Sequence, residues 1–497
     1  RYHYGCASNH PSAPRSDALH ILWNFPDALT WSNSTTAIYG SVLAPFAAAN
    51  ATYSQINGNI IFDSYSGNAE SHNELFTGEP PEPTDSLANV AADQIRILLD
   101  AGIEVRMLVS ETCPDRERTG IFLDPRVEWV RIVNTRQGSP ITWYDYSSSI
   151  GRVHDSFFEE TDLIARDLVC CLDGVDFCLM HDILYQGWHL VHNIAVRKAQ
   201  EQLPGVRFVE FTHSLPLPRP EKMVYPLSAR FTGMPNTRFA YPTRCGLPAL
   251  ARQYDIPESA CAVVNNTLPL LEWADPAVRT VACSMDLSEK EILIVCPGRL
   301  TPAKRFEKAA MLADAIRTVS GKSTGLIFCD FPSADIPAPV YKSMIRTEGK
   351  KAGLADGDLL FTSDLGFPDG FPRQAVLELF GLSNLFLCPS FSESFGLTVL
   401  EAASRGNFLV LNEAVPALEE LGKSLVASFL RWDAHNFGFD TQEHYSPSER
   451  AYYLEHGARI VRAMEENPVL RAKTAARTRY STRWVAEHQL LPLLDSF

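Results

Sequence analysis

A strand that runs through a tight turn into a helix decides the fold class, and residues 385–403 read LFLCPSFSESFGLTVLEAA. The apolar run ends at Cys388 and a helix begins near Gly396, so the turn is expected at the carboxyl edge of a parallel sheet. A helix N-terminus there presents free backbone N–H groups and a positive dipole end, which bind anions. Glu393 in the turn and Glu401 in the helix accept hydrogen bonds from hydroxyls and repel phosphate. The segment predicts a polyhydroxylated ligand, although a capping glutamate and a solvated helix glutamate would fit it equally well.

A second strand ends beside a pair of cations, in residues 292–305, ILIVCPGRLTPAKR. Gly298 lets the backbone approach a ligand closely, and Arg299 and Lys304 present a guanidinium fork and a point charge near the next helix. Surface cations at a helix N-terminus oppose the helix dipole, which disfavours a purely structural explanation. Two such cations neutralise the charge that develops on a leaving diphosphate without a metal ion. This stretch therefore predicts a diphosphate-binding edge.

Short apolar runs alternate with amphipathic helical stretches along the chain, which is typical of β-α units on a parallel sheet. Strands are expected at residues 19–25, 59–62, 104–110, 127–133, 177–181, 206–212, 291–297, 324–329, 359–362, 384–388 and 408–411. Helices are expected at residues 85–101, 306–320, 340–352, 374–382, 397–405, 447–466 and 475–494, and a linker at 265–290. The pattern predicts an α/β protein of two Rossmann-like domains facing each other across a cleft, with ligands beyond the carboxyl ends of the strands.

Composition excludes several classes of partner. The chain has 497 residues and a net charge of −15, with its acids scattered rather than clustered. Such a surface repels nucleic-acid backbones and anionic lipids, so neither is an expected partner. The longest apolar runs are strand-length, far short of the ~20 residues of a transmembrane segment, and no basic-then-apolar signal opens the sequence. The expectation is a soluble cytoplasmic protein.

Neither the cysteines nor the short acidic motifs predict a metal site. None of the 11 cysteines lies in a C-x-x-C pair, and Cys296, Cys329 and Cys388 end apolar strands, where cysteine behaves as a small apolar residue. Residues 356–358, Asp-Gly-Asp, lie between a helix and a strand at the opposite edge of the sheet. Turn chemistry accounts for them, and no metal ligand is expected there.

The two cations and the two glutamates, the latter in an E-x₇-E frame, resemble the donor-binding half of the retaining GT-B glycosyltransferases of family 4. Residues 241–266 are similar to that family's lead into the interdomain linker, and residues 477–494 to its last helix, which crosses back to the first domain. The resemblance implies an acceptor domain over residues 1–275, a nucleotide-sugar donor domain over 276–475, and a crossing helix over 476–497.

The resemblance also implies a role for each matching position. Arg299 and Lys304 would bind the donor diphosphate and stabilise it as it leaves. Glu393 would contact hydroxyls of the donor sugar, and Glu401 would accept from the nucleotide ribose. The donor would lie beside the backbone of Gly298, Phe395, Gly396 and Leu397. Enzymes of this family are metal-independent, so no cofactor is expected besides the nucleoside diphosphate sugar itself.

The first half of the chain matches the family more loosely. His213, which follows the strand expected at 206–212, resembles the histidine that the family places beside the reacting sugar. His181 and Asp182, at the end of another strand, are further candidates for the acceptor side. The family also has a Gly-Gly loop before its first long helix, whereas residues 78–86 carry prolines and acids.

Two segments are candidates to replace that Gly-Gly loop: residues 66–68, Ser-Gly-Asn, and residues 27–35. Since the first domain of this family normally builds the acceptor site, the missing loop leaves the acceptor side the least defined part of the prediction.

The predicted function is transfer of a hexose-type sugar from a nucleoside diphosphate to an acceptor hydroxyl, with retention of configuration. A UDP-sugar is preferred to a GDP-sugar because such donors are commoner, and the acidic surface favours a soluble acceptor over a lipid. One alternative is a catalytically inactive protein that binds sugar nucleotides, which the complete set of cations and acids disfavours. Another is a GT-B sugar-nucleotide epimerase, which would consume donor without an acceptor. A phosphorylase would need a pyridoxal-linked lysine, for which the sequence offers no context.

Overall fold

The computed structural model describes residues 22–25, 27–35, 37–57, 59–72, 86–136, 139–140, 146–147, 152–432 and 447–497. The chain divides into two compact units, Arg1–Asn89 and Val90–Phe497. The boundary falls within the first long helix, α2 (Ser86–Asp100). The strands that precede α2 therefore form a unit of their own.

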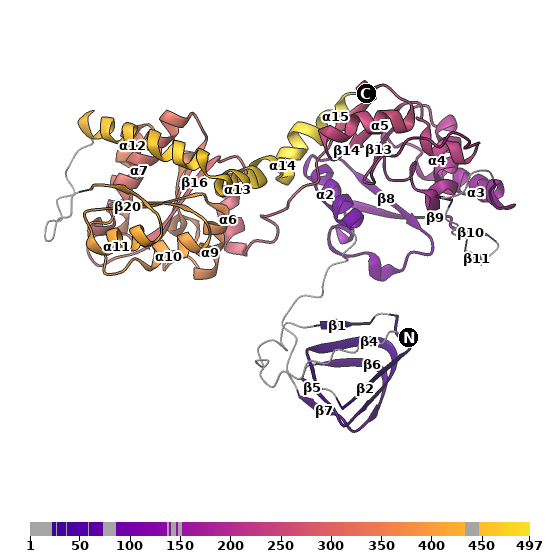
Figure 1. Cartoon of the computed structure of the whole chain (residues 1–497), viewed down its shortest axis with the longest axis horizontal. Coiled ribbons are helices and arrows are strands. Elements are labelled where there is room, and N and C mark those ends of the chain that lie inside the picture. The colour runs from indigo at the N-terminus through magenta and orange to yellow at the C-terminus, as the bar shows by residue number, and fades with distance from the viewer. Residues whose placement is uncertain are drawn as a thin grey trace. The chain divides into compact units, whose positions relative to one another are not determined.

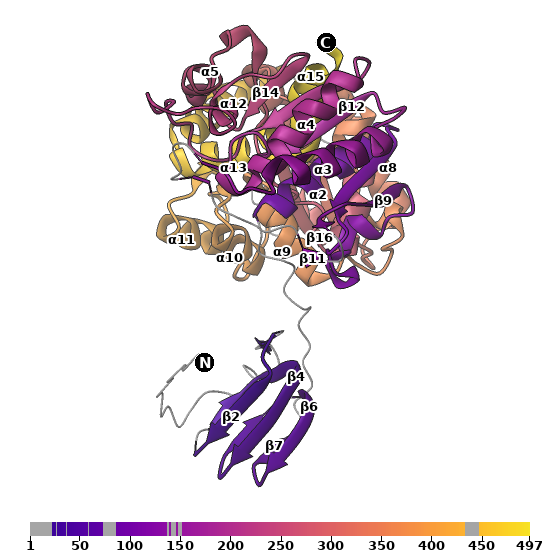
Figure 2. The same cartoon turned by 90° about the vertical axis from the view of Figure 1, so that its right-hand side faces the viewer.

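The first unit is a small coil of parallel strands (Figures 1 and 2). One sheet consists of β4 (Ser41–Thr52) with β1 (Leu22–Asn24), β2 (Thr30–Ser34) and β6 (Ile60–Gly67). The other consists of β3 (Ala37–Tyr39), β5 (Gln55–Asn57) and β7 (Glu70–His72). Alternation along β2 exposes every second residue, while Val42, Ala51 and Ile56 are fully buried in the interior of the coil.

The structure differs here from the expected single domain over residues 1–275. The strands expected at residues 19–25 and 59–62 correspond to β1 and β6, and both belong to the coil. A strand of a parallel coil carries the same local pattern as a strand of a β-α unit, and the two differ in the helix that follows. Only strands and short turns join β1 to β7 in the described residues, which is why local patterning assigned them to the wrong architecture.

The second unit begins with a Rossmann-like domain (Figure 1). Its strands β8 (Val105–Ser110) and β9 (Val127–Ile132) pair in parallel. A second parallel sheet follows the order β12 (Phe177–His181), β13 (Arg207–Phe211), β14 (Thr237–Tyr241) and β15 (Cys261–Val263). The helices are α2, α3 (Phe157–Cys171), α4 (Leu190–Gln202) and α5 (Leu247–Tyr254). Of these, β14, β15, α3 and α4 were not among the elements expected from sequence.

A second Rossmann-like domain carries a single six-stranded parallel sheet. Its strands follow the order β18 (Leu359–Phe361), β17 (Thr324–Phe331), β16 (Ile292–Arg299), β19 (Leu385–Cys388), β20 (Phe408–Asn412) and β21 (Ser428–Leu430). The helices are α7 (Phe306–Ser320), α8 (Ala338–Ala352), α9 (Arg373–Leu382), α10 (Leu397–Ser404), α11 (Pro416–Ser424) and α12 (Pro447–Glu466). Numbered within the domain, the strand order is 3-2-1-4-5-6, so the chain reverses direction across the sheet between β16 and β19. The predicted α/β fold with two Rossmann-like domains is confirmed.

The expected linker at residues 265–290 contains a helix, α6 (Pro276–Ser284). Asp275 caps its start by accepting from the backbone N–H of Ala277 at 2.8 Å. Val278 and Val281 are fully buried against the second domain's sheet, so α6 belongs to that domain. The polar residues around the helix hid it from a reading based on composition.

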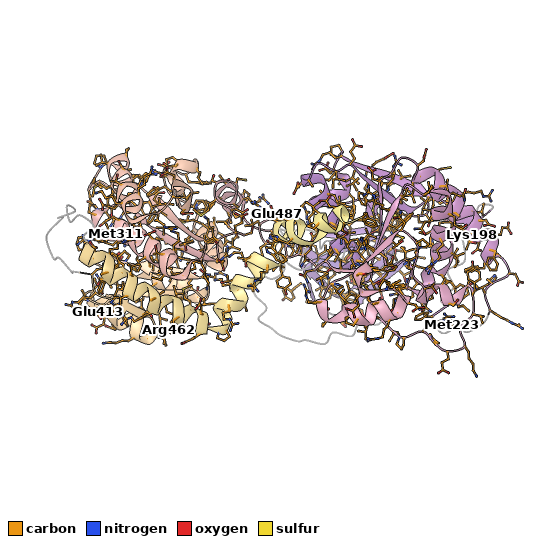
Figure 3. All side chains as sticks on the ribbon, turned by 90° about the horizontal axis from the view of Figure 1, so that it is seen from above. Lys198, Met223, Met311, Glu413, Arg462 and Glu487 are labelled. Carbon is orange, nitrogen blue, oxygen red and sulfur yellow. The ribbon has the colours of Figure 1, made fainter. Side chains whose placement is uncertain are left out.

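The C-terminal segment contacts both Rossmann-like domains. In α13 (Pro468–Arg479), the Lys473 ammonium donates to the carbonyls of Phe380 and Arg405 in the second domain, at 2.9 and 2.8 Å. The segment continues through α14 (Thr482–Val485) and a π-helical turn (Ala486–Leu490), beside Glu487 in Figure 3, to α15 (Leu491–Asp495). Buried apolar residues of these turns, including Leu490, join the core under the sheet of the first domain. Among the described helices, none has the length and apolarity needed to cross a membrane.

Candidate functional site

Two loops meet at the point where the six-stranded sheet reverses direction. One loop, residues 298–305, follows β16, and the other, residues 389–396, follows β19. The two strands are neighbours, and the Phe391 N–H of the second loop donates to the Ala303 carbonyl of the first at 3.1 Å. The Asn412 amide, at the end of β20, donates to the Ser390 carbonyl at 3.1 Å. The carboxyl ends of three adjacent strands thus fix the loops where open parallel sheets bind ligands.

Lys304 and Glu393 form an ion pair between the two loops. The Lys304 ammonium donates to Glu393 Oε1, and the side chains are only 23% and 16% exposed. Lys304 is held by a short 3₁₀ turn whose first residue, Thr301, accepts from the Ala303 N–H. The structure therefore brings together a predicted phosphate-binding cation and a predicted sugar-binding carboxylate from positions 89 residues apart.

The two loop glycines allow the close approach that the sequence predicted. Gly396 has φ +90°, a conformation that L side chains rarely adopt, and a Cβ there would lie 3.1 Å from Val399. A Cβ on Gly298 would lie 3.2 Å from the Phe306 ring. The flanking side chains of Phe395 and Leu397 are more than half exposed.

Arg299 is exposed as the last residue of β16, and it pairs in register with Phe331 of β17. It thus stands at the same carboxyl edge as the two loops, as expected for a residue that meets a bound anion.

Glu401 lies in α10 and is paired with a residue that the sequence analysis did not identify. Arg373, at the start of α9, donates from Nε and Nη2 to Glu401 Oε1 at 3.1 and 2.9 Å. The Glu401 side chain is 14% exposed and the Arg373 side chain 74% exposed. The pair joins two helices 28 residues apart in sequence, so no local pattern could have indicated it.

In the first Rossmann-like domain, the structure brings His181, Asp182 and His213 together. His181 ends β12, and its Nδ1 lies 2.9 Å from Nε2 of His213, which follows β13. One carboxylate oxygen of Asp182 accepts from the His213 backbone N–H at 2.9 Å, and the other accepts from the Ser214 hydroxyl at 2.9 Å. The neighbouring strand ends therefore form a second polar cluster at a carboxyl edge.

Burial keeps both histidines neutral near pH 7. Desolvation lowers the pKa of His181 to about 3, and the nearby His213 lowers it further. Desolvation also lowers the pKa of His213, against the opposing effect of the Asp182 carboxylate. A neutral imidazole has one N–H donor and one lone-pair acceptor, so each ring can both give and accept a hydrogen bond.

Glu210 lies beneath this cluster and was also missed by the sequence analysis. It is fully buried in β13, and its Oε1 accepts from the Leu184 N–H at 3.0 Å while Oε2 has no partner among the described residues. Burial raises the pKa of Glu210 well above its usual range, so the group is a neutral acid. In the strand sequence Arg-Phe-Val-Glu-Phe its position resembles that of an ordinary solvent-facing glutamate.

The other sequence expectations have clear structural outcomes. Asp358 pairs with Lys290 at 2.8 Å in a turn, as part of the second domain's surface. Among the described residues, no group of three or more His, Cys, Asp or Glu side chains could hold a metal ion. Residues 27–35 and 66–68, the candidates to replace the Gly-Gly loop, belong to the first unit's coil instead. The proline-rich residues 78–84 lie outside the described residues.

Two family models match separate parts of the chain. Residues 284–430, which contain both loops of the second domain, match the model "Glycosyl transferases group 1". Residues 4–73 match the model "Putative Ice-binding-like adhesive domain", in the first unit. No curated protein matches the chain in sequence.

Solved structures resemble the chain at low identity. A glycosyltransferase from Rickettsia africae is 12% identical, with 82% of this chain and 91% of that chain covered and a TM-score of 0.29. The E. coli structure titled "Trehalose-6-phosphate from E. coli bound with UDP-2-fluoro glucose" is 15% identical, with 84% and 98% covered and a TM-score of 0.30. Anabaena Alr3699/HepE with UDP and glucose is 12% identical, with 84% and 98% covered and a TM-score of 0.29. These scores are too low to argue from, and the two-domain GT-B fold rests on the strand order described above.

Proposed function

We propose that the protein is a retaining, metal-independent glycosyltransferase of the family 4 type, which moves a hexose from a nucleoside diphosphate to the hydroxyl of a soluble acceptor. The observation that carries the proposal is the meeting of Lys304 and Glu393 beside the start of α10, within the segment that matches the glycosyltransferase group 1 model. A cation, a carboxylate and a helix N-terminus together match the parts of a sugar nucleotide.

In this proposal each group of the second domain binds one part of the donor. Arg299 and Lys304 hold the diphosphate, and the backbone around Gly396 adds N–H donors. Glu393 accepts from hydroxyls of the sugar and Glu401 accepts from those of the ribose. Because Arg373 occupies only Oε1 of Glu401, the second carboxylate oxygen remains available to the ribose.

The chemistry requires only that negative charge be stabilised as the diphosphate leaves. Arg299 and Lys304 supply that stabilisation at fixed positions, which is the most effective form of charge stabilisation in an active site. Attack on the same face of the sugar retains its configuration, and the leaving phosphate takes the proton of the acceptor hydroxyl. No separate enzymatic base is needed for this step.

A thermal-shift screen with nucleoside diphosphates and their sugars tests donor binding. UDP-glucose and UDP are expected to raise the melting temperature more than their GDP counterparts, because only a ligand bound to the folded state stabilises it. Incubation with UDP-glucose and a panel of sugars then separates the alternatives. Binding without release of UDP indicates an inactive sugar-nucleotide-binding protein, and isomerisation of the donor sugar without an acceptor indicates an epimerase.

Chelation tests the metal-free mechanism. Transfer is expected to continue at an unchanged rate in excess EDTA, because the two cations take the place of a metal ion at the diphosphate. The measurement is the initial rate of UDP release before and after EDTA, and after addition of Mg²⁺ or Mn²⁺. Loss of activity in EDTA and its recovery with either metal would contradict the mechanism.

We infer that the first unit is an adhesive module that attaches the transferase to a solid surface. Its match to the adhesive-domain model is supported by an in-register row of small polar side chains on the coil. Ser32, Asn50 and Ser66 face one another on successive strands, and all three are exposed. Strands about 4.8 Å apart present such a row as a regular, flat array, which suits a repetitive solid such as ice.

Arginine substitutions in this row test the module. Ser32→Arg with Asn50→Arg places bulk and charge in the array and is expected to reduce adsorption of the full chain to ice at least ~10-fold, since the flat contact is lost. The matched control is Asn24→Arg, at the exposed end of β1. Adsorption is measured as the fraction of protein retained in a slowly grown ice phase. Equal retention of the double variant and the unsubstituted protein would contradict the assignment.

A further inference from the structure

The two histidines of the first Rossmann-like domain are aligned for a hydrogen bond between their rings. His181 Nδ1 and His213 Nε2 are 2.9 Å apart, and the ring planes differ by only 12°. Since the lone pair and the N–H of imidazole lie in the ring plane, nearly parallel rings allow a direct bond. His181 also stacks on Phe211, with ring centroids 5.1 Å apart and an interplanar angle of 14°. The orientation of both rings is therefore fixed by the structure around them.

Asp182 fixes the pair from below and is fully occupied in doing so. It is 3% exposed, and its backbone adopts φ +55°, a conformation that costs energy for a residue other than glycine. Its carboxylate accepts from the His213 N–H and from the Ser214 hydroxyl, both at 2.9 Å, and from the Gln186 amide at 3.4 Å. Such a carboxylate has no capacity left for an acceptor sugar, so Asp182 is a positioning residue rather than the binding group that the sequence indicated.

The remaining ring nitrogens are available to a ligand. Neither His181 Nε2 nor His213 Nδ1 has a hydrogen-bond partner in the part of the chain that the structure describes, and neither is sealed from solvent. If His181 donates to His213, then His213 Nδ1 carries the second proton and His181 Nε2 is an acceptor. If His213 donates instead, the two outer roles are exchanged. In both states the pair offers one donor and one acceptor.

We propose that His181 and His213 form a tautomer-coupled pair that presents one donor and one acceptor to the hydroxyls of a sugar-like acceptor, with Asp182 holding the pair in place. The proposal rests on the proposed transferase activity and deepens its acceptor side. A sugar hydroxyl both donates and accepts, so a pair that can exchange its two roles matches either orientation of neighbouring hydroxyls. A single histidine with a fixed tautomer would match only one.

The coupling itself is measured by long-range ¹H–¹⁵N spectra of the histidine rings in the ¹⁵N-labelled full chain, assigned from the histidine variants. The unsubstituted protein is expected to show His181 and His213 in linked tautomers. In His181→Phe, which keeps the stacking on Phe211, His213 is expected to show both tautomers in exchange. In His181→Asn, whose amide replaces Nδ1, a single His213 tautomer is expected to return. Identical His213 spectra in all three proteins would overturn the proposal.

The role in acceptor binding is measured with UDP-glucose as donor and D-glucose as the acceptor probe. His181→Phe is expected to lower kcat/KM for D-glucose ~10-fold through KM, as for the loss of one hydrogen bond to the acceptor, while the UDP-glucose thermal shift is unchanged. The matched control is His456→Phe, which removes a hydrogen-bonded ring in α12 of the second domain and should alter neither value. A fall in the donor-induced shift would instead assign His181 a structural role and overturn the proposal.

If the unsubstituted protein neither binds nor consumes UDP-glucose, the proposed transferase function fails, and the ring spectra still decide the tautomer coupling. If UDP-glucose is turned over but the His213 tautomer does not depend on His181, the pair fails while the transferase function stands. The two failures are therefore distinguishable.

Discussion

Arg299→Ala is expected to lower the turnover of the transferase at least ~100-fold, the usual cost of removing one fixed charge-stabilising donor from an active site. Arg299 stands exposed at the carboxyl end of β16, beside the point where the strand order reverses. Its guanidinium can hold a diphosphate through two hydrogen bonds, and that interaction strengthens as negative charge develops on the leaving group. The effect should therefore appear in kcat as well as in donor binding.

The measurement is the initial rate of UDP release at saturating UDP-glucose, together with the melting temperature of the variant. Because Arg299 is exposed, its removal should leave the melting temperature of the donor-free protein within about 2 °C, as for most surface substitutions. Arg299→Lys should recover only part of the rate, since an ammonium lacks the planar fork. Arg462→Ala, on the exposed face of α12 (Figure 3), is the control and should have no effect. Normal turnover in Arg299→Ala would remove Arg299 from the site.

Exchange of the charges at Lys304 and Glu393 is expected to separate the structural role of this ion pair from its catalytic role. Lys304→Glu alone places two partly buried carboxylates together, and it should cost about 1–3 kcal/mol of stability and reduce turnover at least ~100-fold. Adding Glu393→Lys restores an ion pair with the opposite direction. The double variant should therefore recover its melting temperature and remain inactive, because the diphosphate cation and the sugar-binding carboxylate have changed places.

The matched control is the pair Lys423–Glu419 on the surface of α11, where the side chains are 68% and 45% exposed. Reversal of the first charge there should cost no more than about 0.5 kcal/mol and leave turnover unchanged. Thermal melts and UDP release are measured for each single and double variant. A double variant of Lys304 and Glu393 that regains normal turnover would assign the pair a structural role only.

The second domain could be predicted from sequence because its signals are local. The strand, turn and helix of residues 385–403 follow each other without interruption, and so do those of residues 292–305, so that chain order alone places Glu393 and Lys304 at strand ends. Their contact was also predictable, because neighbouring parallel strands bring their carboxyl ends together. The partners of these groups were not predictable. Arg373 reaches Glu401 from a different helix, and side-chain contacts of that kind leave no periodic trace in the sequence.

The first unit was missed because its strands carry the alternation of an ordinary half-buried sheet. The spacing of successive coils, rather than the pattern within each strand, distinguishes the coil from β-α units, and β1, β4 and β6 leave no room for a helix between them. Glu210 was missed for a different reason. A glutamate within a short strand indicates a solvent-facing position unless both faces of the sheet are known to be covered, and only the tertiary structure shows that.

The chain passes between its two Rossmann-like domains twice, and the two passages are tied together. The Leu268 N–H donates to the Tyr480 carbonyl at 2.7 Å, and Asn265 exchanges hydrogen bonds of 2.7 and 2.6 Å with the Gln489 side chain. Two tethers joined near one point permit rotation about that point and oppose sliding in any direction. Any closure of the domains on a substrate is thus a pivoting motion, which returns the histidine pair and the donor loops to the same mutual alignment in every catalytic cycle.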